Sequence, residues 1–226
     1  MPPRLDDRAT ASVASADELE PALHSLGLGF GVPVVVVVGG AEGVSAADAA
    51  TIRTAFADAV LPAAASAGAT IVDGGTSSGV MRLLGEEHGA SGVRTPLVGV
   101  VVERLARDDP SLLDPGHTHF VLVPGEDWGD ESAWLAAVAR TLAGDAATVT
   151  LLANGGDIAL RDVARSVEDA RPVIVLAGSG RTADELAAAE TPRAHELVRT
   201  QLVSSVAASE LAAVRAAVED AVRERS

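Results

Sequence analysis

The sequence lacks cysteine, lysine and tyrosine altogether. Without cysteine it has no disulfides, no thiol nucleophile and no thiolate metal site. Without lysine it cannot form the Schiff base of a pyridoxal enzyme or supply the lysine of a P-loop, and a Tyr-Lys dehydrogenase pair is also excluded. All 17 strongly basic side chains are therefore arginines.

Aromatic residues and positive charge are scarce as well. A formal charge of −15, three Phe and two Trp argue against nucleic-acid binding, because polyanions are repelled and bases find no stacking platform. No apolar run approaches the roughly 20 residues of a membrane span, and the N-terminus lacks a signal-peptide pattern, so we expect a cytoplasmic protein. A small phosphate ligand stays compatible, since distant carboxylates are screened.

Apolar, β-branched runs alternate with helical patterns along the chain. The clearest run, Pro33 to Val38, is typical of a central parallel strand covered on both faces. Ser45 and Asp48 then predict a helix start, and Pro62 a bend. Further strands are predicted at 69–73, 96–102, 119–123, 147–153 and 172–177, and helices at 78–88, 131–143, 157–168 and 181–189. This alternation predicts an α/β, Rossmann-like three-layer domain with a mostly parallel central sheet.

We divide the chain into three parts. Residues 1–30 are expected to form a tail with a loose helix, and residues 31–190 the Rossmann-like domain. Residues 191–226 are predicted to form helices that pack on the domain or in an oligomer interface, which makes a homo-oligomer plausible. Between Glu103 and Gly116 a polar stretch replaces a helix, and such loops are often functional.

Glycine-rich turns follow four predicted strands and precede helices. They are Gly39-Gly40, Gly74-Gly75, Gly155-Gly156 and Gly178-Ser179-Gly180. Parallel strands end at one edge of the sheet, where helix amino-termini present free N–H groups to ligands. Any one turn could simply reverse the chain tightly, but glycine also lets a phosphate approach the backbone. Their shared edge predicts a phosphate-binding site.

Arg181 follows the last of these turns, in the first turn of a predicted helix. A cation there opposes the helix dipole, and a bound anion would reverse that penalty. We therefore expect Arg181 to contact a phosphate. The alternative is an ordinary surface or salt-bridged arginine.

Four motifs occur in order: VVVVVGGAEG at 34–43, IVDGGTSSGVMRLLGE at 71–86, LLDPGHTHFVLV at 112–123 and PVIVLAGSGRTADEL at 172–186. Together they resemble the SLOG domain of TRPM channels in its stand-alone prokaryotic form, over about residues 33 to 190. The resemblance implies that the glycine loops bind ADP-ribose or a related NAD-like nucleotide, for sensing rather than catalysis, and no other cofactor is expected. Asp73 stands where the family often has threonine, which leaves its role open.

The glycine turns and the resemblance together predict one set of ligand-binding residues. Its members are Gly39, Gly40, Ala41, Glu42, Gly74, Gly75, Thr76, Ser77, Gly79, His119, Gly155, Gly156, Gly178, Ser179, Gly180 and Arg181.

An enzymatic alternative rests on the related LOG-type phosphoribohydrolases. Their motif PGG-x-G-T-x-x-E corresponds to NGGDIALRD here, with Ile158 and Ala159 in place of Gly-Thr. Asp162 occupies the glutamate position, where a carboxylate could stabilise an oxocarbenium-like centre during cleavage of an N-glycosidic bond. Otherwise Asp162 is a solvated helix aspartate. Whether it faces the glycine-lined cleft or solvent distinguishes the two.

Two other chemistries are weaker. Gly75 to Gly79 fits the G-x-S-x-G elbow with Ser77 as nucleophile, but the histidine that such a hydrolase needs after a later strand is lacking, since His195 lies in a predicted helix. His117 and His119 could hold a metal with Asp114. With no cysteine and no second histidine cluster, we expect no metal site and a ligand-proximal or structural role.

Overall fold

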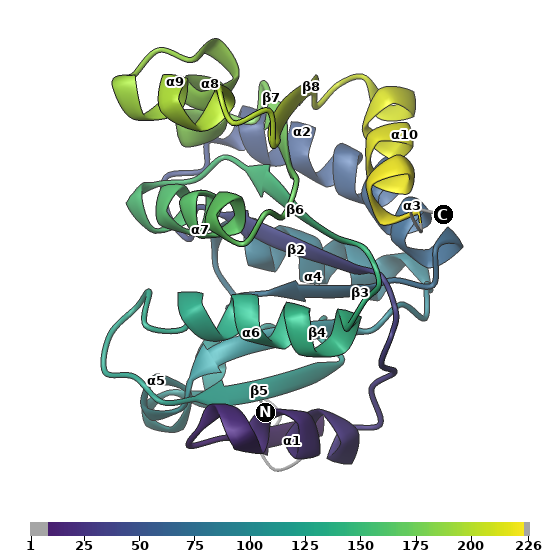
Figure 1. Cartoon of the computed structure of the whole chain (residues 1–226), viewed down its shortest axis with the longest axis vertical. Helices are drawn as coiled ribbons and strands as arrows, with labels where there is room; N and C mark the ends of the chain where they lie inside the picture. The colour runs from purple at the N-terminus through teal and green to yellow at the C-terminus, as the bar shows by residue number, and fades with distance from the viewer. Residues whose placement is uncertain (1–8, 224–226) are drawn as a thin grey trace.

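A single sheet of eight parallel strands forms the centre of the computed structural model, which describes residues 9–223 (Figure 1). The strand order is β1-β5-β4-β3-β2-β6-β7-β8, and every pairing within the sheet is parallel. The predicted Rossmann-like α/β class is therefore confirmed. The strands are β1 (Ala9–Ser12), β2 (Val34–Gly39), β3 (Thr70–Asp73), β4 (Leu97–Val102), β5 (His119–Val123), β6 (Thr148–Ala153), β7 (Val173–Ala177) and β8 (Val203–Ala207).

Helices cover both faces of this sheet (Figure 1). One face carries α1 (Leu19–Ser25), α6 (Ser132–Ala143), α7 (Asp157–Glu168), α8 (Arg181–Ala188) and α9 (Pro192–Val198). The other carries α2 (Ala46–Ala55), α3 (Leu61–Ser66), α4 (Gly79–Ser91) and α10 (Leu211–Val222). Val34, Val36 and Val38 pack on the first layer, while Val35 and Val37 pack on the second. The apolar run of β2 is continuous because both of its faces are buried.

The sheet continues beyond the predicted domain at both edges. Residues 9–12, expected as part of a tail, pair with β5, and residues 203–207, expected to be helical, pair with β7. In residues 9–30 and 191–223 the predictions were wrong for these two segments only, because α1, α9 and α10 lie where helices were expected. Residues 103–108, for which no helix was predicted, form the short helix α5 (Glu103–Asp108).

The helix after β2 has the predicted start and bend. Ser45 Oγ accepts a hydrogen bond from the backbone N–H of Asp48 at 3.1 Å, as a helix N-cap does. A π-helical turn, Phe56–Val60, joins α2 to α3, and the N–H of Leu61 reaches back to the carbonyl of Phe56. Pro62 has no N–H to continue the regular ladder, which explains the irregular turn here.

The topological switch point of the sheet lies between β2 and β6, where the order in which successive strands are added changes direction. Strands β3 to β5 lie on one side of β2, and β6 to β8 on the other. In open parallel sheets the loops at such a switch point diverge and leave a crevice beyond the strand ends. Across residues 9–223, no helix combines the length and hydrophobicity that a bilayer span requires.

Candidate functional site

A cavity of about 540 Å³ lies at this switch point, beyond the carboxyl ends of β2, β3 and β6. Its volume lies within the range of about 300–1,000 Å³ typical of small-molecule sites. Valines of β2, Met81 and Leu135 give it apolar walls, and backbone and charged groups line the rest. We call this cavity the cleft.

The guanidinium of Arg181 lies against three glycines in two loops at the cleft. A β-carbon built on Gly40 would lie 3.1 Å from Nη1, one on Gly43 would lie 3.3 Å from Nη1, and one on Gly156 would lie 2.9 Å from Nη2. Nη1 also donates a hydrogen bond to the carbonyl oxygen of Glu42 at 2.7 Å. One side chain from the β7–α8 loop therefore bridges the loops after β2 and β6.

Arg181 occupies an unfavourable position for an arginine. Its φ of 51° is left-handed, a conformation that costs a side-chain-bearing residue about 1–3 kcal/mol. As the first residue of α8 it also opposes the helix dipole. It is exposed and forms no ion pair within residues 9–223. A bound anion would compensate both the dipole and the missing partner.

Four acidic residues line the same cleft, namely Glu42, Glu131, Asp157 and Asp162, and burial shifts the pKa of two of them. Burial raises the pKa of Asp162 to about 6, and the charge of Glu131 acts in the same direction. Burial likewise raises the pKa of Glu131. Oδ1 of Asp162 is buried without a hydrogen-bond partner among the described residues. Asp162 therefore faces the cleft rather than bulk solvent, and it can exist in either protonation state near neutral pH.

Trp128 also lines the cleft, although its side chain is 47% exposed. It lies in the loop between β5 and α6, three residues before Glu131. An exposed indole on the wall of a largely apolar cavity offers a flat surface on which an aromatic ring of a ligand can stack.

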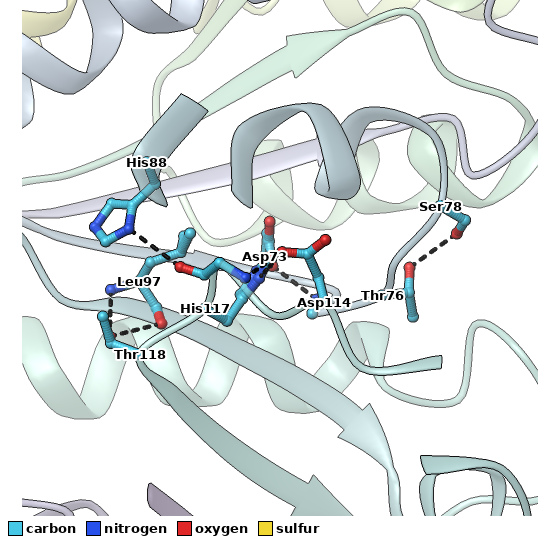
Figure 2. Close-up of polar contacts among 10 residues, drawn as sticks. Asp73, Thr76, Ser78, His88, Leu97, Asp114, His117 and Thr118 are labelled. Carbon is cyan, nitrogen blue, oxygen red and sulfur yellow. Dashed lines mark hydrogen bonds and ion pairs between the residues drawn. The ribbon is translucent and has the colours of Figure 1, made fainter. Parts of the chain in front are cut away.

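A buried charge network lies beneath the second glycine loop (Figure 2). Asp73, the last residue of β3, accepts a hydrogen bond from His117 Nε2 at 2.7 Å, and Asp114 accepts one from Nδ1 at 3.2 Å. All three side chains are buried. Burial alone would lower the pKa of His117, but the charge of Asp73 and hydrogen bonds to both carboxylates raise it to about 9. His117 is therefore an imidazolium at neutral pH.

This network fixes the turn that enters the cleft. Asp73 Oδ1 accepts a hydrogen bond from the N–H of Gly75 at 2.7 Å, and the carbonyl of Gly75 accepts one from the N–H of Asp114 at 2.9 Å. On either side of Gly75, Gly74 and Thr76 line the cleft. The role of Asp73, open from the sequence, is thus to hold the imidazolium and the turn together.

Comparison with known proteins identifies the family. The family model described as "SLOG in TRPM, prokaryote" matches residues 32–217. The chain belongs to this SLOG family. The match confirms the resemblance inferred from the four motifs, and it extends past residue 190 to include β8.

Two solved structures share the fold of this SLOG domain. The molybdenum cofactor binding protein of the phototrophic bacterium Rippkaea orientalis is 14% identical, with a TM-score of 0.55 over 80% of this chain and 93% of that chain. The molybdenum cofactor carrier protein of Chlamydomonas reinhardtii is 17% identical, with a TM-score of 0.56 over 84% and 97%. At these identities the likeness shows the Rossmann-like fold alone. A search of curated proteins gives no match.

The SLOG domain brings about half of the predicted ligand-binding residues to the cleft. With Asp162, the predicted residues on its wall are Gly39, Gly40, Ala41, Glu42, Gly74, Thr76, Gly156 and Arg181. The lining residues that were not predicted are Val37, Val38, Ser78, Met81, Leu112, Trp128, Glu131, Leu135, Asp157, Ile158 and Ala159. Apart from their nearness to strand ends, these residues carry no sequence signal, because the tertiary fold alone places them.

Other predicted residues lie behind the wall and support it. A β-carbon on Gly79 would lie 1.9 Å from the carbonyl oxygen of Gly40, so this glycine lets two loops touch. Ser179 is buried, and its Oγ accepts a hydrogen bond from the N–H of Asn154 at 2.8 Å, which ties the loops after β6 and β7 together. Besides His119, the predicted residues that do not line the cleft are Gly75, Ser77, Gly79, Gly155, Gly178, Ser179 and Gly180.

His119 lies at the amino end of its strand, on the side of the sheet away from the cleft, so its predicted ligand contact does not fit the structure. It is the first residue of β5, whereas the cleft lies beyond the carboxyl ends of the strands. Its Nδ1 is 2.7 Å from Oγ1 of Thr118. Of the two histidines in the motif, His117 contacts the cleft loop through Asp73 and His119 does not.

Proposed function

We propose that this SLOG protein binds a phosphate-bearing nucleotide of the ADP-ribose or NAD type in the cleft and acts as a ligand sensor. The observation that carries this proposal is the position of Arg181, whose guanidinium lies between the Gly40 and Gly156 loops. A guanidinium pairs with phosphate through two parallel, charge-assisted hydrogen bonds.

The surroundings of Arg181 support an anionic ligand. Helices α7 and α8 both begin at the cleft, at Asp157 and Arg181, and their free N–H groups and dipoles favour negative charge there. Glycine at positions 40 and 156 makes room for the guanidinium itself, because a β-carbon would lie 3.1 Å from Nη1 at position 40 and 2.9 Å from Nη2 at position 156.

The remainder of the cleft supports a ligand that combines a phosphate with an aromatic base. Trp128 offers a stacking surface, and the walls contributed by β2 and Leu135 are apolar. Glu131 and Asp162 would accept hydrogen bonds from ribose hydroxyl groups. A nucleotide supplies all three kinds of group in one molecule.

Calorimetric titration tests the proposal. ADP-ribose, NAD and AMP form the panel, together with molybdenum cofactor because two proteins of similar fold are named for it. We expect at least one nucleotide to bind, and Arg181→Ala to weaken its binding. Arg94→Ala is the matched control, because Arg94 is exposed and forms no ion pair within the described chain. A panel without any nucleotide binding would overturn the proposal.

A second candidate function is cleavage of the N-glycosidic bond of the bound nucleotide. It is favoured by the position of Asp162 on the cleft wall and by its raised pKa, which suits proton transfer near neutral pH. The ionised carboxylate could also stabilise an oxocarbenium-like centre. Incubation with each nucleotide should then release a base or ribose phosphate, and Asp162→Asn should stop this while the exposed Asp145→Asn does not. Absence of any product would refute the enzymatic candidate.

Two further properties belong to this proposal. We expect a cytoplasmic location, which cell fractionation tests. We also expect a homo-oligomer, as in many α/β proteins, with sedimentation equilibrium as its test. A purely monomeric species at micromolar concentration would contradict the second expectation.

A further inference from the structure

A second cavity, of about 350 Å³, lies on the outer side of α7. Three arginines line it: Arg161 and Arg165 from α7, and Arg193 from the start of α9. Glu168 is the single carboxylate on its wall, and Leu160 contributes an apolar surface. We call this cavity the arginine groove.

Two of these arginines form no ion pair within the described residues, although the chain has 32 acidic residues and only 17 arginines. Longer-range attraction remains, because Arg161 acts on Asp130, Glu131 and Asp162, and Arg165 acts on Asp162. Within residues 9–223, nine arginines form ion pairs with Asp or Glu, but Arg161 and Arg165 form none. They are four residues apart on one helix, a spacing at which like charges repel each other. The third, Arg193, pairs through Nη1 with Glu196 at 3.0 Å. The groove therefore concentrates positive charge in a strongly acidic protein.

The groove is separate from the cleft. The segment 128–132 runs between them, with Trp128 and Glu131 on the cleft wall and Gly129 and Ser132 on the groove wall. A β-carbon on Gly129 would lie 2.8 Å from Nη2 of Arg161, so this glycine gives the guanidinium its place against the segment. The φ of Gly129, 98°, is likewise one that only glycine adopts readily.

We propose that the arginine groove is a second ligand site, which binds a small, multiply charged anion of the polyphosphate class. Three guanidinium groups against one carboxylate favour an anion with more than one charge, and planar guanidinium groups match phosphate oxygens in pairs. The volume suits a small molecule, because it lies at the lower end of the range for ligand pockets.

Titration calorimetry with inorganic tripolyphosphate at about 0.15 M salt, where the Debye length is about 8 Å, tests this site. The double variant Arg161→Gln/Arg165→Gln should bind at least about tenfold more weakly, because it removes charge-assisted hydrogen bonds. The charge-matched control Arg94→Gln/Arg199→Gln should bind as the wild type does. Glu168→Gln should bind more tightly, since it removes the one carboxylate on the groove wall.

Arg181→Ala separates this site from the cleft. It should leave tripolyphosphate binding unchanged even if it abolishes nucleotide binding. Loss of tripolyphosphate binding in Arg181→Ala would place the anion in the cleft and overturn the proposal. Equal weakening in the charge-matched control would show a diffuse charge effect and would also overturn the proposal. The proposal would fail as well if the wild type did not bind tripolyphosphate, or if it bound an acidic peptide selectively instead.

Discussion

Replacing Arg181 by glycine is expected to separate ligand binding from stability. Glycine adopts the left-handed backbone of this residue without strain, which recovers about 1–3 kcal/mol. Against this, the hydrogen bond to the carbonyl of Glu42 is lost, at about 0.5–1.5 kcal/mol, and glycine adds about 0.5–1 kcal/mol of unfolded-state entropy. These terms nearly cancel, so the free energy of unfolding without ligand should change by less than about 1 kcal/mol.

Ligand binding should change far more. A charge-assisted hydrogen bond contributes about 1.5–3 kcal/mol, so Arg181→Gly should weaken nucleotide binding by about 10- to 150-fold. Ligand at 100 times the wild-type Kd stabilises the wild type by about 2.7 kcal/mol, and the same concentration stabilises a variant with tenfold weaker affinity by about 1.4 kcal/mol.

Thermal unfolding with and without ADP-ribose measures both quantities. For a domain of this size, 1 kcal/mol corresponds to about 2–4 °C in Tm. We expect a ligand-free Tm within about 4 °C of the wild type, together with a clearly smaller ligand-induced rise. A ligand-free Tm that falls by 10 °C or more on this scale, or an undiminished ligand shift, would refute the assignment of Arg181 as a strained ligand contact.

Three further predictions concern the titrating groups and the aromatic wall. Because the pKa of Asp162 is raised, the ionised carboxylate destabilises the folded state, and the free energy of unfolding falls as pH rises from 3.8 to about 6. Asp162→Asn should therefore be more stable than the wild type by up to about 3 kcal/mol at pH 7.5, and no more stable near pH 3.5. Urea unfolding at the two pH values measures this difference. The imidazolium of His117 stabilises the folded state fully below pH 6.5, and this stabilisation is lost as pH rises through about 9. The wild type should therefore lose stability between these pH values. His117→Asn should be less stable at every pH but should show no such loss. Trp128→Ala should weaken nucleotide binding by about 1–3 kcal/mol, measured by calorimetry. Trp134→Phe is the control and should not weaken binding, because Trp134 is not on the cleft wall. Equal losses of affinity in the two variants would count against stacking on Trp128.

The interior of the sheet was predictable because central strands and their helices have strong patterns. The predicted strand 119–123 coincides with β5, and the predicted helix 157–168 with α7. The edge strands were not predictable in the same way. In β8 both Ser204 and Ser205 are exposed, and β1 is formed by small residues that are half-buried at most. Strands that pair on one side only bury less surface and therefore leave a weaker apolar pattern.

The site was predictable to the extent that it follows strand ends. The loops after β2, β3, β6 and β7 were identified by their glycines, and Arg181 by its conflict with the helix dipole. The position of Trp128 and Glu131 was not, because nothing in the loop after β5 shows which way it folds. The predicted start of β5 already placed His119 at the amino end of a strand, away from the cleft. The role of His117 was not predictable, because it depends on a buried carboxylate 44 residues earlier in the chain.

A crystal structure with ADP-ribose bound is the most direct test of the proposed ligand site. We expect a phosphate of the ligand within about 2.7–2.9 Å of the Arg181 guanidinium, beside Gly40 and Gly156, with the base against Trp128. A ligand whose phosphates lie away from Arg181, in the arginine groove or elsewhere on the surface, would contradict it.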